Sequence, residues 1–150
     1  MTGFCVNTDK QIILFGVKSP LAVDYQETIE RAGLKLTTAI SVGSTVRLLN
    51  REKLKPLAEC KNGIRPGRFI ACAFVPSNRR KLSQIARENR YVEYPGLIDP
   101  TAVVSRSSRI GVGTYLNAGV VLGGQSIISE HVFINRASSV GHHYSGYFNS

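Results

Sequence analysis

Long apolar runs, acidic residues and closely spaced cysteines are all scarce in this chain of 150 residues. No apolar stretch approaches the roughly 20 residues needed to cross a bilayer, which excludes a transmembrane segment. The N-terminus has no basic segment followed by a long apolar core, so we expect no secretory signal and a cytoplasmic location. The cysteines fit neither a disulfide framework nor a paired zinc motif and mark no catalytic thiol; they are Cys5, Cys60 and Cys72.

Acidic residues are also outnumbered, with 10 against 19 basic residues and a formal net charge of +9. Such an excess favours polyanionic partners, among them nucleic acid, anionic lipid and phosphate-rich small molecules. The basic residues are scattered, and no aromatic residues alternate with them, so only composition supports a nucleic-acid partner. We therefore interpret the charge as a solvated basic face and expect no nucleic-acid partner.

What the first half does contain is an alternation of apolar runs and helical patterns. Three short apolar runs predict buried strands; they span residues 11–16, 34–42 and 68–75. Apolar residues at helical spacing predict one helix from Leu21 to Gly33. A second helix is predicted over residues 79–89, with Ser77 or Asn78 as its N-cap.

Strands that alternate with helices predict a small parallel sheet covered by helices, which we assign to a first domain over residues 1–95. The stretch from Gly43 to Gly67 is less regular and predicts a short helix followed by a loop. The sequence therefore indicates an α/β domain at the N-terminal end.

From about residue 96 the pattern changes to a period of six. An aliphatic residue recurs in eight consecutive units: Ile98, Val104, Ile110, Leu116, Leu122, Ile128, Ile134 and Val140. The next residue in each unit is small or polar, and the fourth residue after each aliphatic one is compact until Tyr144.

A triangular solenoid explains this period, because it turns a corner every six residues and stacks equivalent residues eighteen positions apart. We therefore predict a short parallel β-helix over residues 96–150. An ordinary sandwich of short strands is the alternative, but it would show a period of two instead.

Several segments make the resemblance to a known family specific. They are LIDPTAVVS at the junction, the six-residue repeats, FINRASSVGHH near the end and FIACAFVPSNRRKLSQI before them. The chain resembles the NeuD and PglD family of sugar O- and N-acetyltransferases of bacterial glycan and sialic acid pathways. The resemblance implies a Rossmann-like nucleotide-sugar domain followed by a left-handed β-helix, acetyl-CoA as donor and a homotrimer.

The resemblance also implies the catalytic residues. In the family an asparagine is followed seven residues later by the histidine that acts as general base, and here these are Asn135 and His142. Imidazole suits this task because its ordinary pKa lies near neutrality. His143 follows where an acidic residue often orients the base, so Glu130 or another subunit would supply a carboxylate. We interpret His131 as a surface loop residue and expect no metal site.

The substrate-binding residues are expected in two loops. The loop after the first strand keeps Gly16, with Lys18 and Ser19 placed to contact a phosphate, although the family has a more glycine-rich turn there. After the third strand, Asn78 and Arg79 are the expected contacts by position.

The final repeats differ from the family, because the aliphatic position after the histidines is Gly146. Family members usually continue for several more coils, so we expect a shortened β-helix and a truncated form of such a protein. Two hypotheses follow. The chain is an acetyl-CoA-dependent sugar acetyltransferase, or it is a non-catalytic sugar-binding or assembly module that keeps the fold.

Overall fold

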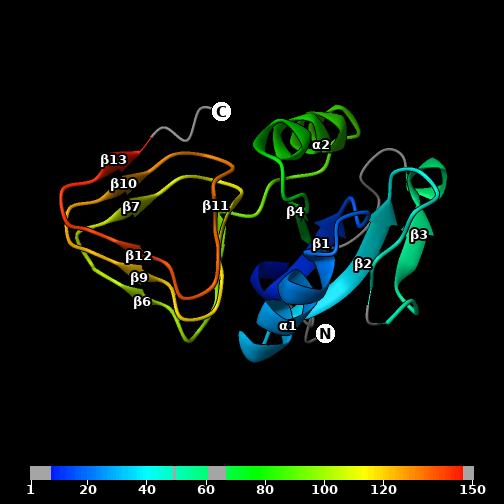
Figure 1. Ribbon diagram of the computed structural model, residues 1–150. Coiled ribbons are helices and arrows are strands. Elements are labelled where there is room, and N and C mark those ends of the chain that lie inside the picture. Colours follow the sequence, from blue (N-terminus) through cyan, green and yellow to red (C-terminus); the bar gives the residue numbers. More distant parts are fainter. Residues whose placement is uncertain (1–7, 49, 61–66, 147–150) are drawn as a thin grey trace, which may run out of the picture.

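The computed structural model describes residues 8–48, 50–60 and 67–146 (Figure 1). Cys5 and the end of the predicted β-helix at residues 147–150 lie outside this range. No helix among the described residues has the length and apolar character that a membrane crossing needs.

The N-terminal part is a four-stranded sheet in the order β3-β2-β1-β4, with every neighbouring pair parallel. Its strands are β1 (Gln11–Phe15), β2 (Lys35–Ser41), β3 (Leu54–Pro56) and β4 (Arg68–Ala71). The helices are α1 (Ala22–Arg31), α2 (Pro76–Glu88) and two short 3-10 turns, Thr8–Lys10 and Leu57–Glu59. The small parallel sheet predicted for residues 1–95 is thus present, while its assignment as Rossmann-like stays a prediction.

Strand β1 is an inner strand, between β2 and β4, and apolar clusters cover both of its faces. Ile12 and Leu14 belong to the apolar cluster that contains α1, whereas Ile13 and Phe15 belong to the cluster that contains α2. Successive side chains of a strand point to opposite faces, so a strand between two helix layers must be apolar throughout. This explains why the segment reads as a continuous apolar run.

The C-terminal part forms coils of three short strands each, and Figure 1 shows them down the coil axis. The strands are β5 (Gly96–Ile98), β6 (Val103–Val104), β7 (Arg109–Ile110), β8 (Thr114–Leu116), β9 (Val121–Leu122), β10 (Ile127–Ile128), β11 (Phe133–Ile134), β12 (Ser139–Val140) and β13 (Ser145–Gly146). They make three parallel sheets, β11-β8-β5, β12-β9-β6 and β13-β10-β7.

The register confirms the predicted repeat. Leu116 pairs with Ile98 and Ile134, and Leu122 pairs with Val104 and Val140, so equivalent aliphatic residues stack eighteen positions apart. Leu116, Leu122 and Ile128 are almost completely buried inside the coil. The β-helix is therefore parallel and short, while the hand of the coil stays a prediction.

The corners recur at one position of the repeat. Every sixth residue adopts a positive φ: Gly113 (70°), Gly119 (70°), Gln125 (59°), His131 (57°), Ala137 (57°) and His143 (57°). The left-handed region costs a non-glycine residue about 1–2 kcal/mol. From Ile110 to Val140 the turn therefore lies three positions after each aliphatic residue of the repeat.

Ala137 offers a test of this corner geometry, because its side chain is exposed and loses no packing when removed. We expect Ala137→Gly to raise the free energy of unfolding by about 0.5–1 kcal/mol, because glycine adopts a positive φ without strain. Ala137→Val should lower it, since a β-branched residue is disfavoured there. Urea denaturation measures both variants, and a less stable glycine variant would contradict the assignment.

The sheet β11-β8-β5 is the face of the β-helix that packs against the N-terminal part. Leu97 and Tyr115 lie in the same apolar cluster as Ile12 and Tyr25, so one core extends across both parts of the chain. The Tyr25 and Tyr115 rings lie 4.1 Å apart between centroids. The boundary between domains 1–95 and 96–150 coincides with the start of β5 and stays a prediction.

Three local predictions are wrong. Helix α2 begins at Pro76 with Val75 as N-cap, and neither Ser77 nor Asn78 caps it, because proline at the first position already fixes a helical φ. Over its described residues, 43–48, 50–60 and 67, the irregular stretch forms the edge strand β3 and the 3-10 helix Leu57–Glu59 in place of a short α-helix. His131 is buried and not on the surface.

Candidate functional site

A cavity of about 510 Å³ opens at the carboxyl ends of β1 and β4. Its walls come from the loop after β1, the loop after β4 and the first turns of α2. The chain leaves β1 toward β2 on one side, whereas β4 lies on the other side of β1. Open parallel sheets bind ligands at this point, where the strand order reverses.

The cavity wall is basic and apolar. It is lined by Gly16, Lys18, Ser19, Pro20, Val42, Cys72, Ala73, Phe74, Val75, Asn78, Lys81, Leu82 and Ile85. Among these described residues none is acidic, and Lys18 and Lys81 carry the only formal charges. Burial raises the pKa of the Cys72 thiol, so this cysteine contributes apolar surface and no nucleophile. The cavity is suited to a ligand with negative charge.

The structure thus brings four of the five predicted substrate residues to one cavity, namely Gly16, Lys18, Ser19 and Asn78. The sequence did not point to Lys81, because a lysine within a predicted helix is most often solvated and its place at the cavity depends on how the helix packs.

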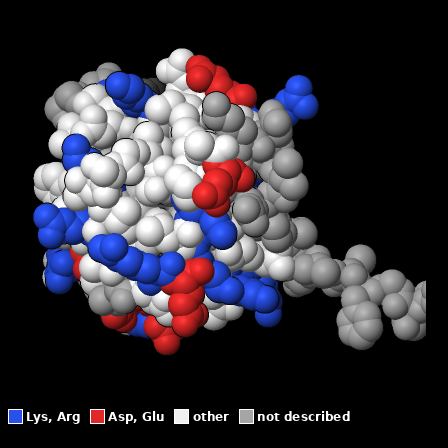
Figure 2. All heavy atoms as spheres, turned by 90° about the vertical axis from the view of Figure 1, so that its right-hand side faces the viewer, with Lys and Arg blue, Asp and Glu red and all other residues white. Residues whose placement is uncertain are grey.

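Figure 2 shows the face of the molecule seen from the side of β3, where Lys and Arg lie among Asp and Glu. On that face basic residues therefore form no uninterrupted patch.

The packing of α2 on β1 explains why residue 16 is a glycine. A Cβ atom on Gly16 would lie 2.5 Å from Cδ1 of Leu82, and its φ is +81°. Only glycine therefore allows α2 to pack this closely over the end of β1. The Gly16 N–H donates to the carbonyl of Ile40 at 2.9 Å, so at this position the backbone donor is already used within the sheet.

Arg79, the fifth predicted substrate residue, does not line the cavity. Its side chain is 3 % exposed, and Nε donates to the carbonyl of His131 at 2.8 Å. Nη1 donates to the carbonyls of Ala73 and Phe74 at 2.7 and 2.6 Å. The guanidinium therefore holds the loop after β4 against a corner of the β-helix, and a substrate contact by Arg79 stays a prediction.

His131 is held by its side chain as well. Its Nε2 lies 2.6 Å from Oε1 of Glu93, and Ser83 Oγ donates to the same oxygen at 2.9 Å. Burial would raise the pKa of Glu93, but the hydrogen bonds from His131 and Ser83 lower it overall. This buried pair joins the β-helix to the segment that follows α2.

The predicted catalytic histidines occupy the corner between β12 and β13. His142 and His143 are both exposed, and their rings meet edge to face at 5.0 Å between centroids. The His143 N–H donates to the Gly124 carbonyl at 2.9 Å, which anchors this corner on the coil before it. A Cβ atom on Gly123 would lie 2.6 Å from the backbone nitrogen of His142, so glycine lets the coils approach here.

Asn135 lies at the preceding corner of the same coil. It is exposed, and its Oδ1 accepts a hydrogen bond from the Arg136 N–H at 2.8 Å. Arg136 reaches Asp24 of α1 at 2.7 Å, so this corner adjoins the N-terminal part. Glu130 lies at the corner between β10 and β11. Among the described residues, no hydrogen bond or ion pair joins Asn135 or Glu130 to His142.

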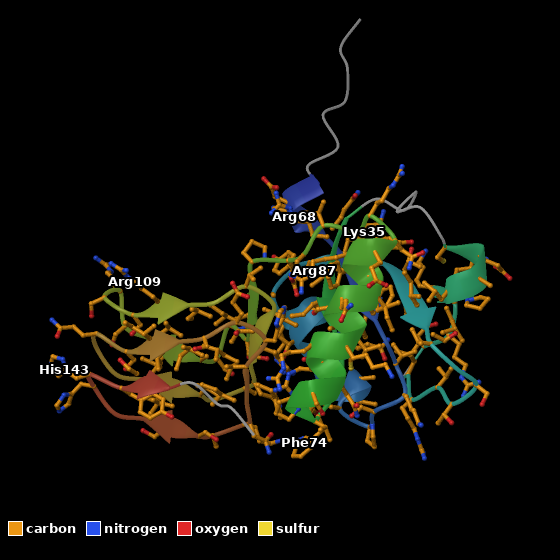
Figure 3. All side chains as sticks on the ribbon, turned by 90° about the horizontal axis from the view of Figure 1, so that it is seen from above. Lys35, Arg68, Phe74, Arg87, Arg109 and His143 are labelled. Atoms are coloured by element: carbon orange, nitrogen blue, oxygen red, sulfur yellow. The ribbon has the colours of Figure 1, made fainter. Side chains whose placement is uncertain are left out.

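The histidine corner and the cavity lie on different sides of the β-helix within one chain. Figure 3 labels His143 at the end away from α2, and Phe74 beside the start of α2. Figure 1 agrees, because the corner between β12 and β13 lies opposite β11, the strand that faces the N-terminal part. Among the described residues, no group of three or more His, Cys, Asp or Glu is placed to hold a metal ion.

Solved structures of bacterial acetyltransferases share this fold. The acetyltransferase domain of PglB from Neisseria gonorrhoeae, in complex with acetyl coenzyme A, matches at TM-score 0.61 and 20% identity over 89% of this chain. PerB from Caulobacter crescentus, in complex with CoA and GDP-perosamine, matches at TM-score 0.63 and 24% identity over 88%. A histidine-to-asparagine mutant of perosamine N-acetyltransferase from the same organism matches at TM-score 0.69 and 22% identity over 88%.

The matched region is a part of each solved structure. The chain spans 65% of the PglB domain, 62% of PerB and 63% of the perosamine N-acetyltransferase mutant. No protein-family model and no curated protein matches the sequence. At these identities the similarity establishes the fold alone. The matched region covers both the N-terminal sheet and the parallel β-helix of this chain.

Proposed function

We propose that the protein is an acetyl-CoA-dependent acetyltransferase that acts on an amino or hydroxyl group of a nucleotide-linked or sialic-type sugar in bacterial glycan biosynthesis. The observation that carries the proposal is that one chain has both a pair of exposed histidines on a β-helix corner and a basic cavity at the switch point of a parallel sheet. The similar solved structures described above are acetyltransferases, one in complex with acetyl coenzyme A and another with CoA and GDP-perosamine.

The cavity would hold the charged part of the acceptor. Lys18 and Lys81 supply positive charge from two elements of the wall, the loop after β1 and helix α2. Ser19 and Asn78 add groups that can hydrogen-bond to a phosphate or a hydroxyl. A nucleoside diphosphate sugar meets these requirements, because it combines phosphate charge with a polar ring.

His142 would act as general base. Its imidazole would accept the proton of the acceptor amine or hydroxyl as that atom's lone pair attacks the thioester carbonyl carbon. The carbon–sulfur bond then breaks, and His142 returns the proton to the departing sulfur. Asn135 and His143 would position groups at the same site, and acetyl-CoA is the donor substrate.

The two parts of the site would come from different copies of the chain. His143 lies on the side of the β-helix away from α2, whereas the cavity adjoins α2 (Figure 3). An acceptor in the cavity of one copy would therefore meet His142 of a neighbour. A homotrimer completes three such sites by symmetry.

Turnover tests the proposal directly. We expect release of free CoA thiol when the protein is mixed with acetyl-CoA and a panel of amino- and deoxy-sugar nucleotides and sialic acids. Product formed by at least one acceptor supports the enzyme. The enzyme proposal fails if no acceptor is acetylated and calorimetry detects no binding of acetyl-CoA.

One observation favours the alternative, a non-catalytic sugar-binding or assembly module. Within one chain His143 lies on the side of the β-helix away from α2, so a single copy would not bring its histidines to its own cavity. This module would bind a nucleotide sugar in the cavity without acetylating it. Calorimetric binding without thiol release therefore distinguishes the module from the enzyme.

A further inference from the structure

Phe74 is an exposed aromatic residue at the mouth of the cavity. Its side chain is 62 % exposed, although it lines the same cavity as Lys18 and Lys81. Figure 3 labels it beside the start of α2, with its side chain directed outward. A large apolar side chain left open at a ligand cavity is a candidate contact for the ligand itself.

The position of Phe74 is fixed by its neighbours. Arg79 donates a hydrogen bond to its carbonyl at 2.6 Å, and its ring lies edge to face with Phe133, 5.9 Å between centroids. Phe133 in turn stacks on Tyr115 at 5.5 Å, which meets Tyr25 at 4.1 Å. Phe74 is thus the open end of a row of four aromatic rings, and a ligand would find its ring already oriented.

The cavity has a polar part and an apolar part. Lys18, Ser19 and Lys81 lie on the loop after β1 and on α2, whereas Phe74 touches Phe133 of the β-helix. If the charged group of a nucleotide sugar binds the lysines, one end of the ligand extends toward Phe74. That end is the sugar, because in the proposed function His142 of a neighbouring copy must reach the acceptor at the open mouth of the cavity, where Phe74 is exposed.

We propose that Phe74 is a specificity-determining residue whose ring packs against the acceptor sugar, while Lys18 and Lys81 bind the diphosphate. The inference rests on the proposed function and assigns the two ends of the ligand within its site. The C–H groups of a pyranose carry partial positive charge and fit the negative face of an aromatic ring.

Calorimetry with paired ligands separates the two contacts. The probes are UDP with UDP-N-acetylglucosamine and GDP with GDP-mannose, and the pair that the wild type binds more tightly is used throughout. Phe74→Ala should raise the Kd of the nucleotide sugar about tenfold and change the Kd of the free nucleoside diphosphate by less than about twofold. Phe74→Tyr should restore sugar binding, since it keeps the ring. Lys81→Ala should weaken both ligands.

Val92→Ala is the matched control, because Val92 is a similarly exposed apolar residue that does not line the cavity. Unchanged binding of both ligands by Phe74→Ala contradicts the inference alone. Equal weakening of both ligands also contradicts it, because the ring would then contact the nucleoside. Failure of the wild type to bind any of the four ligands contradicts a nucleotide-sugar acceptor, and the inference with it, whereas the acetyltransferase proposal itself fails only by the turnover test above.

Discussion

Replacement of His142 with alanine is expected to lower kcat/KM for acetyl transfer by about 10²–10⁴-fold, the usual contribution of a positioned general base. His142 lies exposed on a corner whose backbone is anchored to the preceding coil through His143 and Gly124, so its removal should leave the fold intact. Steady-state rates of thiol release measure the loss, and circular dichroism checks that the variant is folded.

His143→Ala is the informative comparison for this variant. The two histidines are neighbours with their rings 5.0 Å apart between centroids, and the proposed function assigns the base to His142 alone. We expect His143→Ala to lose about tenfold at most, since it would act by positioning. A larger loss from His143→Ala than from His142→Ala would reverse the assignment of the base.

Asp99→Ala is expected to lower the free energy of unfolding by about 2–4 kcal/mol, because a buried carboxylate loses its hydrogen bonds to Thr28, Thr101 and the exposed Arg31. Asp99 is completely buried, and its Oδ2 accepts hydrogen bonds from Thr28 at 2.6 Å and from Arg31 at 2.6 and 2.9 Å. Its Oδ1 accepts two more from Thr101. The carboxylate therefore ties α1 to the first corner of the β-helix.

Asp99→Asn is the matched control, because it keeps the shape and removes the charge. We expect about half of the loss, since the amide oxygen can still accept the Thr101 hydrogen bonds. Urea denaturation at neutral pH compares the two variants. A loss of less than about 1 kcal/mol for Asp99→Ala would show that the α1 contact is dispensable.

The same carboxylate predicts how stability depends on pH. Burial alone would raise the pKa of Asp99, but hydrogen bonds from Arg31, Thr101 and Thr28 hold it well below its usual range. Its contribution is therefore present above the unfolded pKa of about 4 and is lost as the pH falls below that value. The wild type should lose stability more steeply than Asp99→Asn between about pH 5 and pH 3.

The β-helix could be predicted because its determinants are local and repeated. Each aliphatic residue stacks on its equivalent eighteen positions away, so the spacing of Leu116 and Ile134 in the sequence is also their pairing in space. The exact turn position could not be predicted, because His131 and Ala137 adopt a positive φ that side-chain identity does not reveal. Strand β1 could also be predicted, because burial on both faces requires a continuous apolar run.

The contacts between the two parts of the chain could not be predicted. Arg79 binds the carbonyl of a residue 52 positions away, and Asp99 binds a side chain 68 positions away. Nothing in the local pattern distinguishes such an arginine from one that binds substrate or one on the surface. The position of Arg79 shortly after the third predicted strand pointed to the cavity. Whether its side chain turns from the first turn of α2 toward the cavity depends on where the β-helix docks.

Recovery of activity from two defective variants tests the central claim, that the cavity of one copy works with His142 of another. His142→Ala keeps an intact cavity, whereas a chain with Lys18→Ala and Lys81→Ala keeps an intact histidine. When the two are co-expressed, random assembly should restore activity at roughly a quarter of the sites. A mixture no more active than the better of the two variants alone would contradict a shared site.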